Sequence, residues 1–295
     1  MLLVSIPSPS KGVIPIGPLQ LHAYGLCIAL GVVAAVWLAD RRWVARGGRK
    51  GDVGAVATWA VPAGVIGARM YHVATDWKSF RGQWHTALYI WKGGLGIWGG
   101  VALGTVVGLA VARRRGLPAI VLMDCAAPAI PLAQAIGRWG NWFNQELFGR
   151  PTTAAWGLEI SPSKRPAGYE NFATFHPTFL YESLWNLLIV ATVILVGRQR
   201  SWQLKPGRLF ALYVAMYTFA RFFIERLRID KASLVGGLRI NEWVSAIVFV
   251  IAVAVLVTGT DRRADDTSTD DPRTDDHSAD DQSTPDDQRV ANPAQ

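Results

Sequence analysis

The sequence predicts an all-α integral membrane protein with about seven transmembrane helices, an outside N-terminus, a cytoplasmic C-terminus and an outer-face loop domain. Hydrophobic residues make up 51% of the 295 positions and gather in long runs. The formal charge is +8, but residues 261–295 contain 11 Asp and 4 Arg, which leaves +15 on the first 260 residues. These positive charges lie in short clusters between apolar runs, which is typical of multi-span membrane proteins and unlike the basic stripe of a nucleic-acid-binding protein.

Seven apolar runs are long enough to cross a bilayer, which takes roughly 20 residues. The third, fifth and seventh are the most uniformly apolar. The second, fourth and sixth carry charged residues or prolines, so these positions need buried partners or water. The predicted spans are residues 19–39, 53–74, 93–112, 118–136, 178–197, 207–225 and 241–258.

The orientation follows from the distribution of Lys and Arg. Positive charges follow the first span instead of preceding it, so it is not a cleaved signal peptide. The connections 40–52, 113–117 and 198–208 hold 12 Lys or Arg in 29 residues, whereas the other connections and the N-terminal segment hold 12 in 92. The basic connections belong in the cytoplasm, which places the N-terminus outside and the C-terminus inside.

Two segments outside the spans differ in character. The connection 137–176 is the longest, lies on the predicted outer face, and has the length of loops that usually carry function. Residues 261–295 repeat Asp pairs at a period of five and have almost no apolar side chains, so they cannot bury enough surface to fold. We therefore expect a membrane domain over residues 1–260 and a disordered acidic cytoplasmic tail over residues 261–295.

The segment 137–150, GRWGNWFNQELFGR, concentrates polar residues where the fourth span meets the outer loop. Its arginine offers a rigid fork of donors suited to a phosphate, its asparagines supply donors and acceptors, and its glycines allow close backbone approach. A lone arginine here would be an interfacial residue reaching the headgroups, but the combination favours a phospholipid-handling site. The candidate residues are Arg138, Asn141, Asn144, Glu146 and Gly149.

A second candidate cluster is Arg221 with Glu225, four residues apart on one helix face. The alternative to a functional role is a satisfied ion pair at a helix end. Arg221 lies in an otherwise apolar run, where an arginine costs on the order of 3 kcal/mol to insert at the helix centre. That cost favours a functional role for the pair.

Other polar residues in or near spans are less decisive. The segment 176–182, HPTFLYE, has a proline suited to a helix start and ends in a Tyr-Glu pair that could form a polar patch facing the bundle, with structural and functional roles equally compatible. His22 and Tyr24 lie at the outer end of the first span. Arg69 and Asp124 are also intramembrane, and a structural pairing is the favoured interpretation.

Small residues in the spans point to packing. Glycines recur every four residues on the third span, a ridge that lets a neighbouring helix approach closely. The two cysteines lie in apolar runs, which excludes a disulfide framework and makes them small apolar fillers. The residues are Gly96, Gly100, Gly104 and Gly108 for the ridge, and Cys27 and Cys125 for the fillers.

The stretch GRWGNWFNQELFG at 137–149 resembles the signature of bacterial prolipoprotein diacylglyceryl transferases, roughly GRxGNFxNxExxG, with Trp142 where Phe is usual. The similarity covers residues 15–258 and leaves the acidic tail outside. Further matching segments, in the family's order, are LHAYG at 21–25, KGGLGIWGG at 92–100, MDCAAP at 123–128, HPTFLYE at 176–182 and RFFIE at 221–225.

The resemblance implies a seven-span plasma-membrane enzyme whose site faces the outer leaflet. Such enzymes move the diacylglyceryl group of phosphatidylglycerol onto the lipobox cysteine thiol of a preprolipoprotein. This first step of lipoprotein maturation forms a thioether and releases glycerol 1-phosphate. The implied partners are phosphatidylglycerol, preprolipoprotein signal peptides and the lipid bilayer, with no nucleic acid, metal or organic cofactor.

The resemblance also assigns roles to residues. Arg138 and Arg221 match the family's two essential arginines, and we expect them to stabilise the negative charge that grows on the phosphate. The same positive charges would favour the thiolate of the acceptor cysteine. The other expected site residues are Asn141, Asn144 and Gly149 for the lipid, Glu225 for holding Arg221, and His22, Tyr24 and Glu146 for proton transfer or hydrogen bonding.

One position departs from the family pattern. Gram-negative members carry a histidine, once proposed as the catalytic base, in the segment that matches LGIWGG. This chain has Trp98 there, and an indole cannot accept the proton. Either the base is elsewhere or none is needed.

Two other classes fit the sequence less well. A transporter could line a pathway with intramembrane charges, but transporters often contain internal repeats, and no segment repeats GRWGNWFNQELFG. A metal-dependent phosphotransferase would need paired Asp residues at a span end, whereas the Asp pairs all lie in the tail. The sequence therefore favours the transferase.

Overall fold

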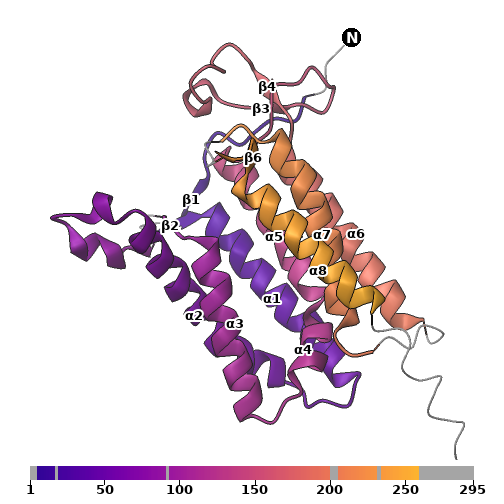
Figure 1. Ribbon diagram of the computed structural model, residues 1–295. Helices are drawn as coiled ribbons and strands as arrows, with labels where there is room; N and C mark the ends of the chain where they lie inside the picture. Colours follow the sequence, from indigo (N-terminus) through magenta and orange to yellow (C-terminus); the bar gives the residue numbers. More distant parts are fainter. Residues whose placement is uncertain (1–4, 17–18, 91–92, 200–204, 231–233, 259–295) are drawn as a thin grey trace, which may run out of the picture. The chain divides into compact units, whose positions relative to one another are not determined.

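Helices make up most of the structure, a computed structural model that describes residues 5–16, 19–90, 93–199, 205–230 and 234–258 (Figure 1). The acidic tail predicted over residues 261–295 lies outside the described residues. The α-helices are α1 (Ala23–Val44), α2 (Asp52–Thr75), α3 (Ile97–Arg114), α4 (Ala119–Ala126), α5 (Ala129–Asn144), α6 (Thr178–Arg198), α7 (Arg208–Leu227) and α8 (Ile240–Val257).

Short strands and 3₁₀ turns connect the helices. In the described part of the chain, the strands form three two-stranded antiparallel sheets. The strands are β1 (Val13–Ile16), β2 (Leu19–His22), β3 (Leu158–Glu159), β4 (Thr174–Phe175), β5 (Leu234–Val235) and β6 (Leu238–Arg239), and the 3₁₀ turns are η1 (Trp77–Phe80), η2 (Trp84–Leu88) and η4 (Pro162–Lys164).

The prediction of a multi-span helical membrane protein is confirmed. Within the described ranges, α1, α2, α3, α6 and α8 are long and apolar enough to cross a membrane, and α4 with α5 adds a sixth candidate if this pair, bent by 41°, forms one span. A helix also occupies the sixth predicted interval, but α7 carries several charged residues and is not among these candidates. The count of seven spans therefore stays a prediction.

Several predicted boundaries are wrong for local reasons. Residues 19–22 form β2, and the first helix starts only at Ala23. The fourth span, predicted as one helix over 118–136, is broken between α4 and α5. Pro128 lies at this break, where its missing N–H and fixed φ suit a new helix start.

The outer loop also starts later than predicted. Residues 137–144 were expected in the loop, but they form the last two turns of α5. Gln145, at φ 53°, ends the helix in the left-handed region. The polar side chains of residues 137–144 recur every three residues. Because this segment is helical, they share one face.

The glycine ridge packs α3 against α2, as predicted. A Cβ on Gly100 or Gly104 would lie 3.2 Å from a backbone oxygen of α2. The approach is closest at Gly99, where a Cβ would lie 2.2 Å from the carbonyl oxygen of Gly67. The two helices lie side by side (Figure 1), at a separation that only small residues permit.

Most of the other helices form a series of neighbours, in which α1 packs on α5, α5 on α6, α6 on α7 and α7 on α8. One end of this set holds the start of α1, the end of α5 and the start of α6. The opposite end holds the basic connections. There Asp124 accepts hydrogen bonds from the backbone N–H groups of Gly207 at 2.7 Å and Phe210 at 3.0 Å. At the same end, Arg46 Nη1 contacts Cys125 Sγ at 3.1 Å.

The expected pairing of Arg69 with Asp124 is wrong. Arg69 is buried at 9% exposure and donates to four backbone carbonyls of the connection after α2, at 2.7–2.9 Å. Asp124 caps the start of α7 instead. Backbone groups satisfy both charges, and sequence spacing does not reveal such partners.

The connection after α5 folds into a cap with its own small core of Phe148, Leu158, Ile160, Phe175 and Phe179. The N-terminal segment crosses this cap. Trp142 Nε1 donates to the carbonyl of Pro7 at 3.0 Å, and Gln145 Nε2 donates to that of Pro9 at 2.8 Å. These contacts hold the end of α5 and the start of the chain together above the site described next.

Candidate functional site

Polar side chains from α5, α6, α7 and the start of α8 meet at the end of the bundle that carries the cap. A continuous set of contacts runs from Glu146 through Asn141, Arg138, Glu182 and Arg221 to Glu225. These residues come from separate parts of the sequence. The packing of α6 between α5 and α7 brings them together.

Arg138 lies two turns before the end of α5 and points toward α6. Its Nη2 lies 2.5 Å from Glu182 Oε2, and its Nη1 donates to Asn141 Oδ1 at 3.3 Å. The side chain is 19% exposed. It is therefore fixed on one side and accessible on another, as a residue that binds an anionic ligand must be.

Arg221 approaches the same carboxylate from α7. Its Nη1 lies 3.4 Å from both oxygens of Glu182, and its Nη2 lies 2.7 Å from Glu225 Oε2. The side chain is 15% exposed. Arg221 thus forms an ion pair with Glu225, four residues away, and the two arginines singled out by the sequence share the carboxylate of Glu182.

Glu182 is not among the site residues predicted from the sequence. It lies in the second turn of α6, is 4% exposed, and touches both arginines. Its sequence signal was a glutamate at the start of an apolar span, which fitted a structural role equally well. Only the packing of α5, α6 and α7 shows that it joins the two cations.

Glu225 is the most buried acid of the network, at 1% exposure. Besides Arg221, its Oε1 accepts from Arg239 Nη1 at 3.0 Å and from Asn241 Nδ2 at 3.3 Å. Arg239 also donates to the backbone carbonyls of Arg228 and Asp230. Arg239 and Asn241 thereby link the connection between α7 and α8 to the ion pair of Arg221 with Glu225.

Asp230 completes this outer contact set. Burial raises the pKa of its carboxyl. The hydrogen bond from Arg228 and the charges of Arg228 and Arg239 together lower this pKa by more, so the pKa of Asp230 lies below its ordinary value. Arg228 Nε lies 2.7 Å from Asp230 Oδ1. Asp230 thus keeps its negative charge beside the two arginines that flank Glu225.

The asparagines at the end of α5 share one carboxylate. Asn141 Nδ2 donates to Glu146 Oε1 at 3.0 Å, and Asn144 Nδ2 donates to the same oxygen at 3.3 Å. The left-handed residues Gln145 and Leu147, at φ 53° and 59°, turn the chain back on either side of Glu146. Because both amide groups donate to Glu146, the amide oxygen of Asn141 is left to accept from Arg138.

Tyr24 reaches this group from α1, close to Asn141, Glu146 and Arg138. Its ring lies over Gly140, where a Cβ would come within 2.4 Å of Tyr24 Cδ2. The glycine therefore permits α1 to pack on α5 at the depth that brings the tyrosine hydroxyl to the network.

Gly140→Ala is expected to lower the free energy of unfolding by about 1–3 kcal/mol, because an overpacked contact must displace the ring or the helix. It should also reduce activity by moving Tyr24 away from Asn141. Thermal unfolding and a turnover assay measure both effects. Gly137→Ala is the matched control, since a Cβ at position 137 meets no atom within 4 Å; equal losses in both variants would contradict the role of the Tyr24 contact.

The other predicted site residues lie elsewhere. His22 is exposed at the N-cap of α1, and no described contact joins it to the arginines. Gly149 packs against the start of α6, and its N–H donates to the carbonyl of His176 at 2.9 Å. Trp98 is 45% exposed in the first turn of α3. The expected roles of His22 and Gly149 remain predictions.

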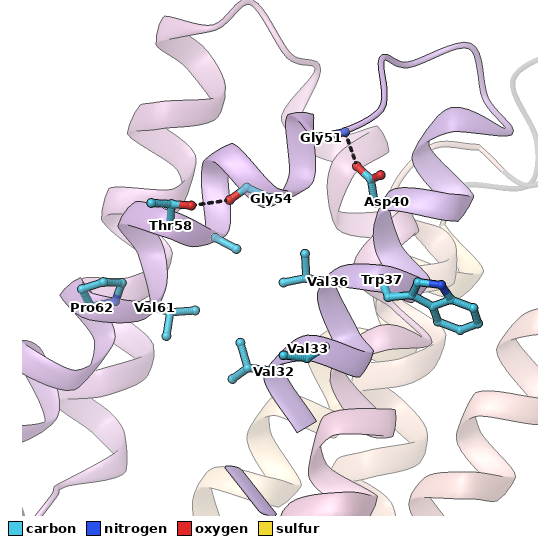
Figure 2. Close-up of a pocket in the computed structure, with 11 residues that line it drawn as sticks. Val32, Val33, Val36, Trp37, Asp40, Gly51, Gly54, Thr58, Val61 and Pro62 are labelled. Carbon is cyan, nitrogen blue, oxygen red and sulfur yellow. Dashed lines mark hydrogen bonds between the residues drawn. The ribbon is translucent and has the colours of Figure 1, made fainter. Parts of the chain in front are cut away.

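An apolar groove of about 630 Å³ lies between α1 and α2, away from the network (Figure 2). Its walls include Val32, Val33 and Val36 from the middle of α1 and Val61 from the first half of α2. Its single charged side chain, Asp40, accepts the N–H of Gly51 at 2.9 Å. The groove therefore lacks a polar set that could carry chemistry.

The arrangement at the cap end can bind an anionic ester. Two partly exposed guanidiniums face a common point, and each is oriented by a buried carboxylate. Fixed cations of this kind stabilise negative charge without solvent reorganisation. Among the described residues, no group of three His, Cys, Asp or Glu side chains could hold a metal ion.

Comparisons with known proteins find a matching family and several similar proteins. A family model described as prolipoprotein diacylglyceryl transferase matches residues 11–258. A Streptomyces coelicolor protein named phosphatidylglycerol--prolipoprotein diacylglyceryl transferase 2 is 55% identical over 265 residues, which cover 89% of this chain and 83% of that protein. A Cutibacterium acnes protein named phosphatidylglycerol--prolipoprotein diacylglyceryl transferase is 51% identical over 257 residues, which cover 86% of each chain.

Proposed function

Since the chain belongs to the prolipoprotein diacylglyceryl transferase family, we infer that it is a phosphatidylglycerol--prolipoprotein diacylglyceryl transferase. It transfers the diacylglyceryl group of phosphatidylglycerol to the lipobox cysteine thiol of a preprolipoprotein. The products are a thioether-linked lipoprotein precursor and glycerol 1-phosphate. The reaction is the first step of bacterial lipoprotein maturation.

The observation that carries this proposal is the meeting of Arg138 and Arg221 at Glu182. The lipid phosphate binds to the two guanidiniums, and the thiol sulfur attacks the adjacent glyceryl carbon. The carbon–oxygen bond breaks, and negative charge grows on the departing phosphate. The arginines stabilise that charge more than the single charge of the bound lipid, which lowers the barrier.

The remaining site residues position the lipid and the arginines. Asn141 and Asn144 orient the glycerol headgroup or the adjoining loop, with Glu146 fixing their amides. Glu225 holds Arg221 in place. Gly149 keeps the cap close to α6, and Tyr24 and His22 remain candidates for hydrogen bonding or proton transfer.

A reconstituted assay tests the reaction directly. The purified full-length protein, supplied with phosphatidylglycerol vesicles and a peptide that carries a lipobox cysteine, should yield a peptide with a thioether-linked diacylglyceryl group. Mass spectrometry detects the product, and a peptide with Ser in place of Cys is the control. Absence of product, with an active reference enzyme in the same assay, would disprove the function.

The proposed topology is seven spans in the plasma membrane, with the N-terminus and the site outside and the C-terminus inside. The site lies at the cap end of the helices, whereas Arg46 and the capped start of α7 mark the opposite, basic end. Basic connections favour the cytoplasm. The charges of α7 at the cap end have partners, which makes this helix acceptable as the remaining span.

The topology predicts the result of reporter fusions. A reporter fused after Val257 should report the cytoplasm, and one inserted in the cap after Lys164 should report the outside. The enzyme activity of an alkaline phosphatase fusion and the fluorescence of a green fluorescent protein fusion at the same position measure each location. An outside signal at Val257 would contradict the span count.

The family match ends at residue 258, which supports the proposed boundary between the membrane domain and the tail near residue 260.

A further inference from the structure

The position of Glu182 conflicts with a site that only binds a phosphate. Its carboxylate, 4% exposed, lies 2.5 Å from Arg138 and 3.4 Å from Arg221, so it occupies the cations that the lipid phosphate needs. A buried charge of this kind is costly unless it is paired. An anion placed between two anion-binding residues therefore calls for a role of its own.

We propose that Glu182 is the catalytic residue that accepts the thiol proton, an inference that rests on the proposed function. When the lipid phosphate binds to Arg138 and Arg221, it draws the guanidiniums away from Glu182. A buried carboxylate that loses its partners must find a new donor. The S–H of the incoming cysteine supplies that donor beside the phosphate.

The step balances in atoms and charge. The proton passes from sulfur to Glu182, the sulfur forms a bond to the glyceryl carbon, and the electron pair of the broken carbon–oxygen bond stays on the phosphate. The phosphate gains one negative charge as Glu182 loses one, so the net charge of the buried site stays constant. Glu182 then returns the proton to a phosphate oxygen, which releases the glycerol phosphate and restores the carboxylate.

The other candidates for this role are occupied or remote. Glu225 is held by Arg221, Arg239 and Asn241, and Glu146 accepts two asparagine amides at an exposed position. Trp98 has no basic atom. Among the described carboxylates, Glu182 alone contacts both arginines.

The surroundings of Glu182 define what a pH experiment can report. The charged and titratable groups that face it are Arg138 from α5 and Arg221 and Tyr217 from α7. On α6, the Asn186 side chain donates to the backbone carbonyl of Glu182 at 2.8 Å. Because these neighbours are the same in the wild type and in a Glu182 variant, a difference between the two pH profiles reports the change at position 182.

Glu182→Gln is the first test, because glutamine keeps the shape and loses the capacity to take the proton. The full-length variant in phosphatidylglycerol nanodiscs should transfer at least about 100-fold more slowly, the lower limit for loss of a general base. Its affinity for phosphatidylglycerol, measured by native mass spectrometry, should be unchanged or higher, since the competing carboxylate is gone. Its rate should rise about tenfold per pH unit below pH 8.5, where the free thiol ionises.

Three variants and the wild-type enzyme separate the outcomes. Glu182→Asp retains a carboxylate and should exceed the Gln variant in rate. Glu242→Gln is the matched control, a buried glutamate paired with Arg226 outside the arginine pair, and should transfer at near wild-type rates. The inference fails if Glu182→Gln keeps near-normal rates, loses lipid binding together with transfer, or equals Glu182→Asp. An inactive wild-type enzyme would instead overturn the proposed function.

Discussion

Arg138→Ala is expected to lower the rate of diacylglyceryl transfer by at least about 100-fold while the protein stays folded. Glu182 at 2.5 Å and Asn141 at 3.3 Å hold the guanidinium at the site, so it lies within reach of the phosphate before the lipid binds. Loss of one such preorganised donor costs roughly 10²–10³ in kcat. The initial rate of thioether formation at saturating phosphatidylglycerol measures the effect.

Two controls isolate the contribution of the guanidinium. Arg138→Lys keeps the charge but lacks the planar fork, so its rate should lie between those of the wild type and the alanine variant. Arg150→Ala removes an exposed arginine at the edge of the cap and should leave the rate near normal. If Arg138→Ala retains near-normal turnover, its assignment to the phosphate is wrong.

Arg221→Ala is expected to abolish turnover to a similar extent and also to destabilise the protein. The side chain contacts two buried carboxylates, Glu182 and Glu225, and removing one partner of a buried pair costs about 3–5 kcal/mol. Arg239 and Asn241 still hold Glu225, so we expect the loss to lie near the lower limit. Thermal unfolding in detergent and the transfer rate at a permissive temperature separate the two effects.

The matched control for this prediction lies on the same helix. Arg226 is 54% exposed and pairs with Glu242 at 2.7 Å, outside the arginine pair. Arg226→Ala should therefore change the rate little, whereas loss of the arginine partner of the buried Glu242 lowers the unfolding temperature. If it matches Arg221→Ala in both measurements, the loss reflects the end of α7 in general and not the phosphate contact.

The part of the site that lies within one short segment was predictable from the sequence. Arg138, Asn141 and Asn144 were selected because they lie together in GRWGNWFNQELFG, although the helix that places them on one face was not predicted. Glu146 follows directly in the turn that ends the helix. The expected pair of Arg221 with Glu225 is local in the same sense, because residues four apart meet on any helix.

The contacts that the sequence did not predict join residues far apart in the chain. Glu182 lies on α6, and its two arginine partners lie on α5 and α7. Arg69 was expected to pair with Asp124, but each charge found backbone groups of a neighbouring connection. Side-chain patterns in a sequence do not record backbone donors and acceptors, so partners of this kind escape such an argument.

The sequence by itself determined the membrane class of the protein, the position of most helices, the placement of basic connections between spans and the identity of the two arginines. These properties depend on composition over a few turns, where hydrophobicity and charge act locally. Only the tertiary structure decided that Glu182 joins Arg138 to Arg221, that α5 extends through the predicted loop, and that Tyr24 reaches Asn141 over Gly140. Such contacts depend on which helices pack together and how closely, and packing is a property of the whole chain.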